Sequence, residues 1–290
     1  MTQGGTARGG LAWPVLAVLV AIVSVQAGAS LAKQLFPLVG PTGTTTLRLV
    51  MGTLILWLVL RPWRMRGALP WRLLLAYGVS LGTMNTFFYL ALERIPLGIA
   101  VAAAFIGPLA VAVAGSRRAI DFVWVALAAG GLLLLVPWDQ TQQPLDVVGL
   151  LLALLAGACW ALYIVFGQRL GADHGTRIVA YGSLVAMLVA APWGIAHAGS
   201  ALLSPALLPA ALGLGVLSMA LPYALEMSAL ARLPTRTFGL LMSLEPAVAA
   251  LCGLLFLHER LGMLQWLAIA AIMAASAGAT LGARIGVRDA

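Results

Sequence analysis

The chain has 290 residues, of which 62% are hydrophobic and only 9% are charged. Soluble domains carry roughly a quarter charged residues, so this composition indicates a polytopic membrane protein and argues against a soluble one. The net charge of +8 would suggest nucleic acid in a soluble chain, but no basic patch interleaved with aromatic residues accompanies it, so no nucleic-acid partner is expected.

In chain order, ten apolar segments are long enough to cross a bilayer as helices, which predicts an all-α membrane protein with one integrated transmembrane domain. The first is expected to be retained rather than cleaved as a signal peptide, because its flank lacks an A-x-A-like site. Turn-forming residues separate several segments, as in FPLVGPTG, RPWRMRGALP and DQTQQP. The predicted ranges are 12–32, 42–60, 71–92, 97–115, 120–137, 147–168, 177–197, 206–230, 236–256 and 263–282.

Basic residues are unevenly distributed between the two ends of these helices. Short cytoplasmic loops hold an excess of Lys and Arg, so the richer side is expected to be the inner one. The outer side then holds only Lys33, Arg94 and Arg260, and both termini are expected in the cytoplasm. The inner side receives Arg8, Arg61, Arg64, Arg66, Arg72, Arg117, Arg118, Arg169, Arg177, Arg232, Arg236, Arg284 and Arg288.

Two pairs of segments repeat at a spacing of five helices. ALERIP (91–96) recurs as ALARLP (229–234), and the same register aligns Pro108 with Pro246. GTLILWLVLRPW (52–63) recurs as GSLVAMLVAAPW (182–193). Because five is odd, paired helices run in opposite directions, which predicts an inverted repeat of residues 1–139 and 140–290 around a site near mid-membrane.

Pro108 and Pro246 each fall inside a predicted helix. Proline lacks an N–H and its ring displaces the carbonyl four residues earlier, so Ala104 and Met242 are expected to lose their helical partners. Unpaired backbone at this depth is tolerated where it faces protein or a water-filled cavity. Two readings remain open: a packing kink, or two matched kinks that act as a gate.

Three charged side chains are predicted within the spans. Glu245 lies about 13 Å from the inner end of its helix, near mid-membrane, where a charge is costly and should face the interior with a partner. Arg48 either reaches a cavity or extends to the outer headgroups. Glu226 lies nearer the inner end and is expected to pair at the inner rim with Arg232 or Arg236. A purely structural ion pair is the alternative role for Glu245.

Polar and aromatic residues on other predicted helices would complete a cavity, although each also suits packing. Cys159 and Cys252 lie in apolar runs at no disulfide or metal spacing, so no metal and no cofactor is expected. The candidate cavity residues are Gln26, Ser30, Asn85, Tyr89, Phe105, Trp160, Tyr163 and Tyr223.

Five segments of the chain are similar to the bacterial threonine and homoserine exporters, of the EamA type within the drug/metabolite transporter superfamily. The resemblance implies a multi-pass inner-membrane protein that exports small hydrophilic amino acids, coupled to protons. In relatives the fourth helix often carries Glu just before the Phe of Phe-x-Gly-Pro, where this chain has Ala104. The segments are VQAGASLAKQLFPLVG (25–40), YGVSLGTMNTFFYLALERIPLGIAVA (77–102), SRRAIDFVWV (116–125), GACWALYIVFGQRLGADHG (157–175) and ARLPTRTFGLLMSLEPAVAA (231–250).

Three classes of function compete, and an exporter explains the repeat, the paired prolines and the sparse buried charge. An intramembrane enzyme is not expected, because the chain has no paired intramembrane aspartates, H-E-x-x-H or G-x-S-x-G. Saturable counterflow separates a carrier from a channel or a scaffold.

Among transporters the alternative is a broad exporter of amines or cationic drugs, whose site would want a carboxylate without a buried cation. A cavity offering both Glu245 and Arg48 would instead complement the ammonium and carboxylate of an amino acid. The expected partners are therefore amino acids, protons and the lipid bilayer, with the protein acting as a monomer or a homodimer.

Overall fold

The computed structural model describes residues 12–64, 69–114, 119–135, 146–174, 178–230, 232–233 and 235–282. Over these ranges all regular structure is helical. The elements are α1 (Ala12–Leu60), η1 (Pro62–Arg64), α2 (Trp71–Arg94), α3 (Leu97–Ala104), α4 (Ile106–Ala114), α5 (Ala119–Leu135), α6 (Val147–His174), α7 (Ile178–Ala198), η3 (Gly199–Leu203), η4 (Pro205–Leu207), α8 (Leu208–Gly215), the π-helical turn η5 (Val216–Ala220), α9 (Leu221–Leu230), α10 (Thr235–Met242), α11 (Glu245–Leu257) and α12 (Met263–Gly282).

Seven helical stretches in the described residues are long and apolar enough to cross a membrane. Two shorter apolar helices, Leu97–Val111 and Phe122–Leu134, accompany them. Large apolar side chains cover much of the outer surface, for example Leu58 at 70% and Phe122 at 76% exposure. Water would disfavour such a surface and lipid favours it, so the fold is that of a helical membrane protein with several spans.

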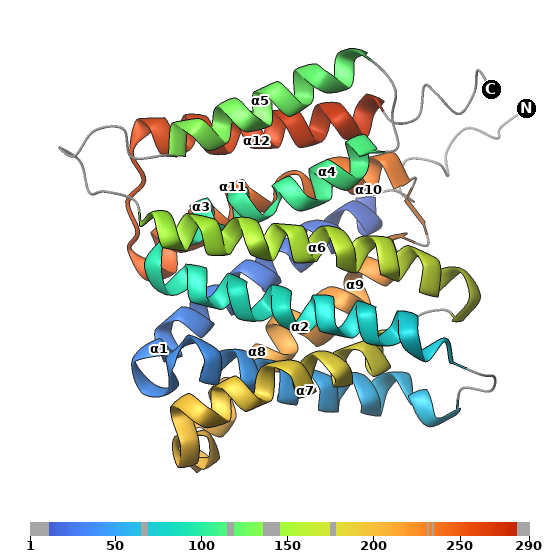
Figure 1. The fold of residues 1–290 in the computed structure, drawn as a ribbon, viewed down its shortest axis with the longest axis vertical. Coiled ribbons are helices and arrows are strands. Elements are labelled where there is room, and N and C mark those ends of the chain that lie inside the picture. Colours follow the sequence, from blue (N-terminus) through green and yellow to red (C-terminus); the bar gives the residue numbers. More distant parts are fainter. Residues whose placement is uncertain are drawn as a thin grey trace, which may run out of the picture.

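The loop that the sequence predicts between residues 32 and 42 is reduced to a single non-helical residue. The first part of α1 continues to Val39, and the helix resumes at Pro41 after the single residue Gly40, at φ 68° and ψ 172°. Glycine adopts this conformation without a Cβ clash, and proline suits the first position of the helix that follows. Figure 1 shows the two parts of α1 running to one end of the molecule and back.

Two predicted helices are interrupted near their prolines, but backbone hydrogen bonds continue across each interruption, for example from the Leu109 N–H to the Phe105 carbonyl and from the Val248 N–H to the Leu244 carbonyl. The range 97–115 is divided into α3 and α4 at Phe105, and 236–256 is divided into α10 and α11 at Ser243 and Leu244. Pro108 and Pro246 therefore lie in the first turns of α4 and α11, just after the junction residues Phe105 and Leu244, which keep helical backbone angles. The first turn tolerates proline because its N–H groups have no helical partner.

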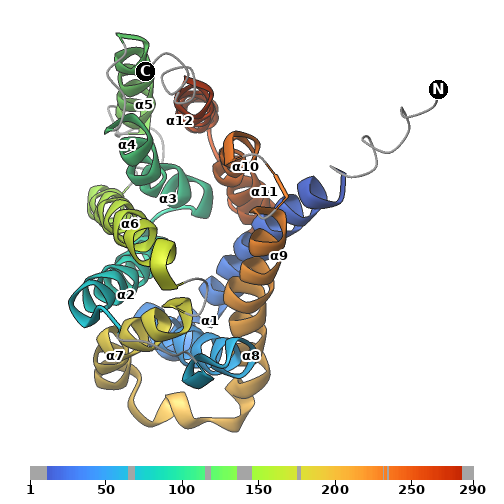
Figure 2. The same cartoon turned by 90° about the vertical axis from the view of Figure 1, so that its right-hand side faces the viewer.

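The helices pack as a bundle in which α6 and α2 form one side, α1 with α8 and α9 forms another, and α5 packs on α12 at an edge. Figure 2 shows this arrangement nearly end-on. Small residues allow the closest approaches. A Cβ on Gly107 would overlap the Gly157 carbonyl oxygen, and one on Gly98 would overlap Ala250. These contacts hold α4 against α6 and α3 against α11.

Both ion pairs among the described residues lie at one end of the bundle. Lys33 Nζ is 2.7 Å from Glu259 Oε1, and Arg94 Nη1 is 2.9 Å from Asp146 Oδ2. The hydrogen bond from Arg94, joined by the N–H groups of Gly149 and Val148, holds the pKa of Asp146 below its ordinary value. At this end, cations that the sequence assigns to the outer side are thus locally neutralised.

Several predictions from the sequence concern residues outside the described ranges. They include the proposed boundary between residues 139 and 140, the DQTQQP segment and both chain termini. Among the predicted inner-side cations, those outside the described residues are Arg8, Arg66, Arg117, Arg118, Arg177, Arg284 and Arg288.

Candidate functional site: a central polar cavity

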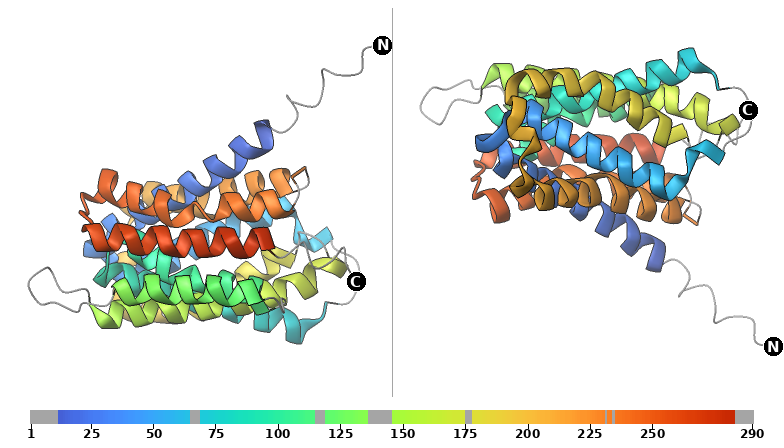
Figure 3. Two further views of the ribbon diagram at one scale, coloured as in Figure 1. Left: turned by 90° about the horizontal axis from the view of Figure 1, so that it is seen from above. Right: turned by 90° about the horizontal axis from the view of Figure 1, so that it is seen from below.

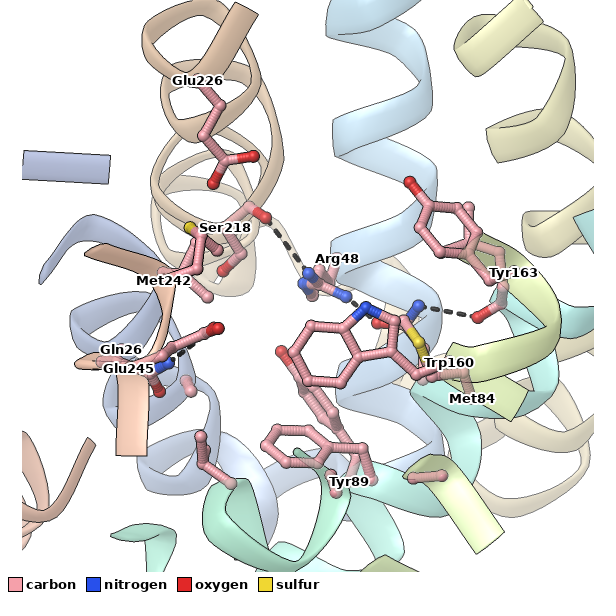
Figure 4. A pocket seen from close by; sticks show the side chains of 18 residues that line it. Gln26, Arg48, Met84, Tyr89, Trp160, Tyr163, Ser218, Glu226, Met242 and Glu245 are labelled. Atoms are coloured by element: carbon pink, nitrogen blue, oxygen red, sulfur yellow. Dashed lines mark hydrogen bonds between the residues drawn. The ribbon is translucent and has the colours of Figure 1, made fainter. Parts of the chain in front are cut away.

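A cavity of about 290 Å³ lies between the helices, and charged and polar side chains from both halves of the chain face it (Figure 4). Its walls come from both parts of α1 and from α2, α3, α6, η5, α9, α10 and α11. The lining residues are Val25, Gln26, Ala29, Arg48, Leu81, Met84, Asn85, Phe88, Tyr89, Val101, Ala104, Ala156, Trp160, Tyr163, Ser218, Glu226, Met242 and Glu245.

Arg48 points into this cavity from the second part of α1 rather than out to the headgroups. Its Nη1 donates to Asn85 Oδ1, and its Nη2 donates to the Ser218 carbonyl at 3.1 Å. The guanidinium carbon lies 5.7 Å from the centroid of the Tyr89 ring. Nε is buried without a hydrogen-bond partner. The guanidinium is thus held in orientation by two hydrogen bonds, and its buried Nε–H remains available to a ligand.

The acceptor at Ser218 has a local cause in the sequence. Pro222 stands four residues later and has no N–H, so the Ser218 carbonyl has no regular helical donor. The chain forms the π-helical turn η5 here, and the Ser218 carbonyl accepts the bond from Arg48 instead. Isolated π turns are frequent at functional sites. Sequence reasoning missed Ser218, although Pro222 was its signal.

Asn85 is held so that its carbonyl oxygen faces the guanidinium. Its Nδ2 donates to the Leu81 carbonyl one turn earlier in α2, at 2.8 Å. This bond fixes which end of the amide faces Arg48 and leaves Oδ1 as the acceptor. The pair is therefore preorganised before any ligand binds.

Glu245 faces the cavity from the opposite wall and is only 7% exposed. It is the first residue of α11, where the positive end of the helix dipole favours a carboxylate. Gln26 Nε2 donates to its Oε1 at 3.1 Å. Its Oε2 and the Gln26 Oε1 are buried without a partner. Among the described ion pairs none joins Glu245 to Arg48.

Aromatic rings form the remaining wall. Phe88 and Tyr89 of α2 and Trp160 and Tyr163 of α6 line the cavity. Phe105, from the break between α3 and α4, packs edge-on against Trp160 with centroids 5.6 Å apart and supports it from behind. The charged groups thus face each other across a partly apolar space, where water is displaced more readily than from a fully polar one.

Seven of the predicted residues share this cavity, and three do not line it. Ser30 is buried and donates from its Oγ to the Gln26 carbonyl at 2.9 Å, so it supports Gln26. Phe105 stands behind Trp160. Tyr223 lines a separate apolar groove between the second part of α1 and α9. The seven are Gln26, Arg48, Asn85, Tyr89, Trp160, Tyr163 and Glu245.

Glu226, which was expected at the inner rim, lines the same cavity. Arg232 is exposed, no described ion pair joins it to Glu226, and the Arg236 side chain lies outside the described residues. The expectation rested on the depth of Glu226 near the inner end of its helix, and the cavity reaches this residue.

Among the described residues, the cavity offers one cation, Arg48, and two carboxylates, Glu226 and Glu245. Buried polar atoms without partners are costly, and four of them belong to residues that line the cavity: Arg48 Nε, Gln26 Oε1, Ser218 Oγ and Glu245 Oε2. A ligand with an anionic and a cationic end, or water, would satisfy them. Within the described residues no His, Cys, Asp and Glu group could hold a metal ion.

Together these features define a helical membrane protein built around a polar cavity within its spans. Residues 147–281 match the EamA-like transporter family, and the chain belongs to that family. It is 57% identical over 272 residues to the threonine/homoserine exporter RhtA of Escherichia coli strain K12, covering 93% of this chain and 92% of that protein.

Other relatives agree with this placement. The threonine/homoserine exporter RhtA of Salmonella typhimurium strain LT2 is 57% identical over 269 residues, with 92% of this chain and 91% of that protein covered. The uncharacterized transporter YwfM of Bacillus subtilis is 28% identical over 215 residues, with 70% and 71% covered. One crystal structure superposes with a TM-score of 0.60 at 22% identity, covering 93% of this chain and 99% of that chain, which shows a shared fold.

Proposed function

We propose that the protein is a secondary transporter of the bacterial inner membrane that exports small hydrophilic amino acids, such as threonine and homoserine, in exchange for protons. One observation carries the proposal: Arg48 and Glu245 face one cavity from opposite walls, and each has a buried polar atom without a partner. Two of the relatives are threonine/homoserine exporters, which agrees with this substrate class.

The two charges match the two ends of an amino acid. The substrate carboxylate accepts from Arg48 Nε, and the ammonium donates to Glu245 Oε2 and Gln26 Oε1. Because Asn85 and the Ser218 carbonyl already hold the guanidinium, little side-chain entropy is lost on binding. A broad exporter of amines or cationic drugs is less well supported, since a fixed guanidinium repels a ligand that is only cationic.

Ten spans follow when the two parts of α1 are counted separately and the two shorter apolar helices are included with the seven candidate spans. Packing contacts support the inverted repeat of residues 1–139 and 140–290. Gly52 in α1 lies against Met219 of η5, and its repeat partner Gly182 in α7 lies against Tyr77 of α2. In the predicted register, the helices that carry Met219 and Tyr77 are also repeat partners.

The proposed orientation has both termini in the cytoplasm. In Figure 3 the start of α1 and the end of α12 lie at the same end of the bundle. Lys33 and Arg94, which the sequence assigns to the outer side, are each paired with an acid. The outer end therefore has little net positive charge from these residues, in keeping with the positive-inside rule.

The arrangement of helices supports an inward-facing state with the outer end closed. Lys33 Nζ donates to Glu259 Oε1 at 2.7 Å and to the Ile95 carbonyl at 3.0 Å, and Glu259 Oε2 accepts from the Leu97 N–H at 2.8 Å. This outer lock joins α1, α3 and the segment after α11. At the other end, α9 packs on α1, and α10 packs on α1 and α12, but within the described residues neither packs closely on α2 or α6.

Proton coupling follows if Glu245 binds either a proton or the substrate ammonium. A buried carboxylate needs a counter-charge or a proton, so removal of one partner favours the other. The amino acid leaves the cytoplasm bound to ionised Glu245 and dissociates outside, and a proton then neutralises Glu245 for the return. Proton and substrate compete for one group, which makes their exchange obligatory.

Counterflow in proteoliposomes tests the proposal. Vesicles are loaded with unlabelled threonine, and uptake of trace labelled threonine is followed. We expect saturable accumulation that homoserine inhibits and that Arg48→Ala abolishes. Accumulation that does not saturate would indicate a channel, and inhibition by tetraalkylammonium ions but not by homoserine would indicate the amine exporter instead.

A further inference from the structure

Glu226 is a cavity residue to which the proposed transport cycle gives no role. It lies on α9 and its carboxylate is directed into the cavity from the wall above Met242 and Ser218 (Figure 4). Among the described residues it has no ion pair and no hydrogen bond from its side chain. The neighbouring cation Arg232 is exposed, outside the cavity.

The charges of the cavity do not balance when a neutral amino acid is bound. Among the described residues, the ionisable groups that line it are Arg48, Glu226, Glu245, Tyr89 and Tyr163. A zwitterion that pairs its carboxylate with Arg48 and its ammonium with Glu245 leaves Glu226 without a counter-charge. An uncompensated carboxylate in a partly desolvated site is unfavourable, so the cavity has room for one more positive charge.

We propose that Glu226 is a second ammonium-binding position, so that the cavity also takes amino acids that carry an amino group on the side chain, such as ornithine or 2,4-diaminobutyrate. This rests on the proposed function, because the α-amino and carboxylate groups bind as in threonine. The side-chain methylenes lie along the apolar surface of Met84, Trp160 and Met242, and the terminal ammonium donates to Glu226.

Two ligands of equal length test the proposal. Ornithine and norvaline have the same five-carbon chain, and only ornithine has the terminal amino group. Each competes with labelled threonine for the purified protein at neutral pH. We expect ornithine to compete about tenfold better than norvaline, since one charge-assisted hydrogen bond has roughly that effect. Equal competition would overturn the proposal and leave a proton as the partner of Glu226.

The variant Glu226→Gln locates the effect. We expect the advantage of ornithine over norvaline to disappear, because the neutral amide side chain offers the terminal ammonium no counter-charge. Glu226→Asp should restore part of the advantage. The matched control Glu93→Gln changes an exposed acid at the far end of α2 and should leave the advantage intact. An undiminished advantage in Glu226→Gln would overturn the proposal.

The two proposals fail in different ways. If threonine does not bind the wild-type protein, the proposed function fails. If threonine binds and depends on Arg48, but ornithine gains nothing from its terminal amino group, only the second ammonium position fails. The comparison of ornithine with norvaline on the wild-type protein does not require any variant to fold.

Discussion

Substitution of Arg48 is the sharpest probe of substrate recognition. Arg48→Ala removes the free Nε donor and the positive charge opposite Glu245. A hydrogen bond to a charged group contributes ~1.5–3 kcal/mol, so threonine affinity should fall by about 10-fold to 150-fold. The assay is equilibrium binding of labelled threonine to purified protein.

Arg48→Lys separates charge from geometry. Lysine keeps the charge, but one ammonium cannot reproduce the planar set of donors that now serves Asn85, the Ser218 carbonyl and the substrate. We expect threonine affinity to fall by about tenfold, which is the lower end of the range expected for Arg48→Ala. Restoration of full affinity by lysine would show that only charge matters.

The control is an arginine outside the cavity. Arg72 lies over the ring of Trp71, 5.2 Å from its centroid, near the start of α2. Arg72→Lys and Arg72→Ala should change threonine affinity by less than about twofold, as expected for exposed charges. Gel filtration of each variant reports whether it remains folded. Unchanged affinity in folded Arg48→Ala would refute the role assigned to Arg48.

Three further predictions concern the helices around the cavity. Alanine at Pro108 or Pro246 supplies the missing N–H, so it should make the helix more regular and slow transport by about tenfold, or ~1.4 kcal/mol on the barrier; full rates in the double variant would show that the interruptions only serve packing. Lys33→Met should weaken the outer lock, so that a thiol-reactive label applied from outside reaches a cysteine placed at Ala104 faster than in the parent; equal labelling rates would exclude a gating role. Gly107→Ala should lower the melting temperature, because its Cβ overlaps the Gly157 carbonyl, whereas Gly130→Ala has open space and should not; equal melting temperatures would contradict this packing.

The helical fold could be predicted from the sequence because hydrophobic length alone determines which segments suit a bilayer. The interruptions within the predicted helices were harder to predict. The pair Glu245 and Pro246 is typical of the first turn of a helix, but inside a long apolar run it predicts a kink equally well. Gly40 shows the opposite error, since a stretch rich in glycine and proline predicted a loop where one residue suffices.

The cavity could be predicted only in part. Arg48, Asn85 and Glu245 stand out because polar groups are rare within spans, whereas Met84 and Phe88 give no such signal. Glu226 was expected at the inner rim from its depth along the helix, and depth alone does not determine whether a side chain lines a cavity.

The central claim is that Glu245 couples protons to amino-acid movement, and one measurement tests it most directly. Proteoliposomes with an acidic interior are diluted into neutral buffer that contains labelled threonine. Protons leaving the vesicles should drive accumulation by the wild-type protein and by the control Glu93→Gln. Glu245→Gln cannot ionise, so the account predicts a folded protein without gradient-driven accumulation. Accumulation by folded Glu245→Gln at the wild-type rate would contradict the account.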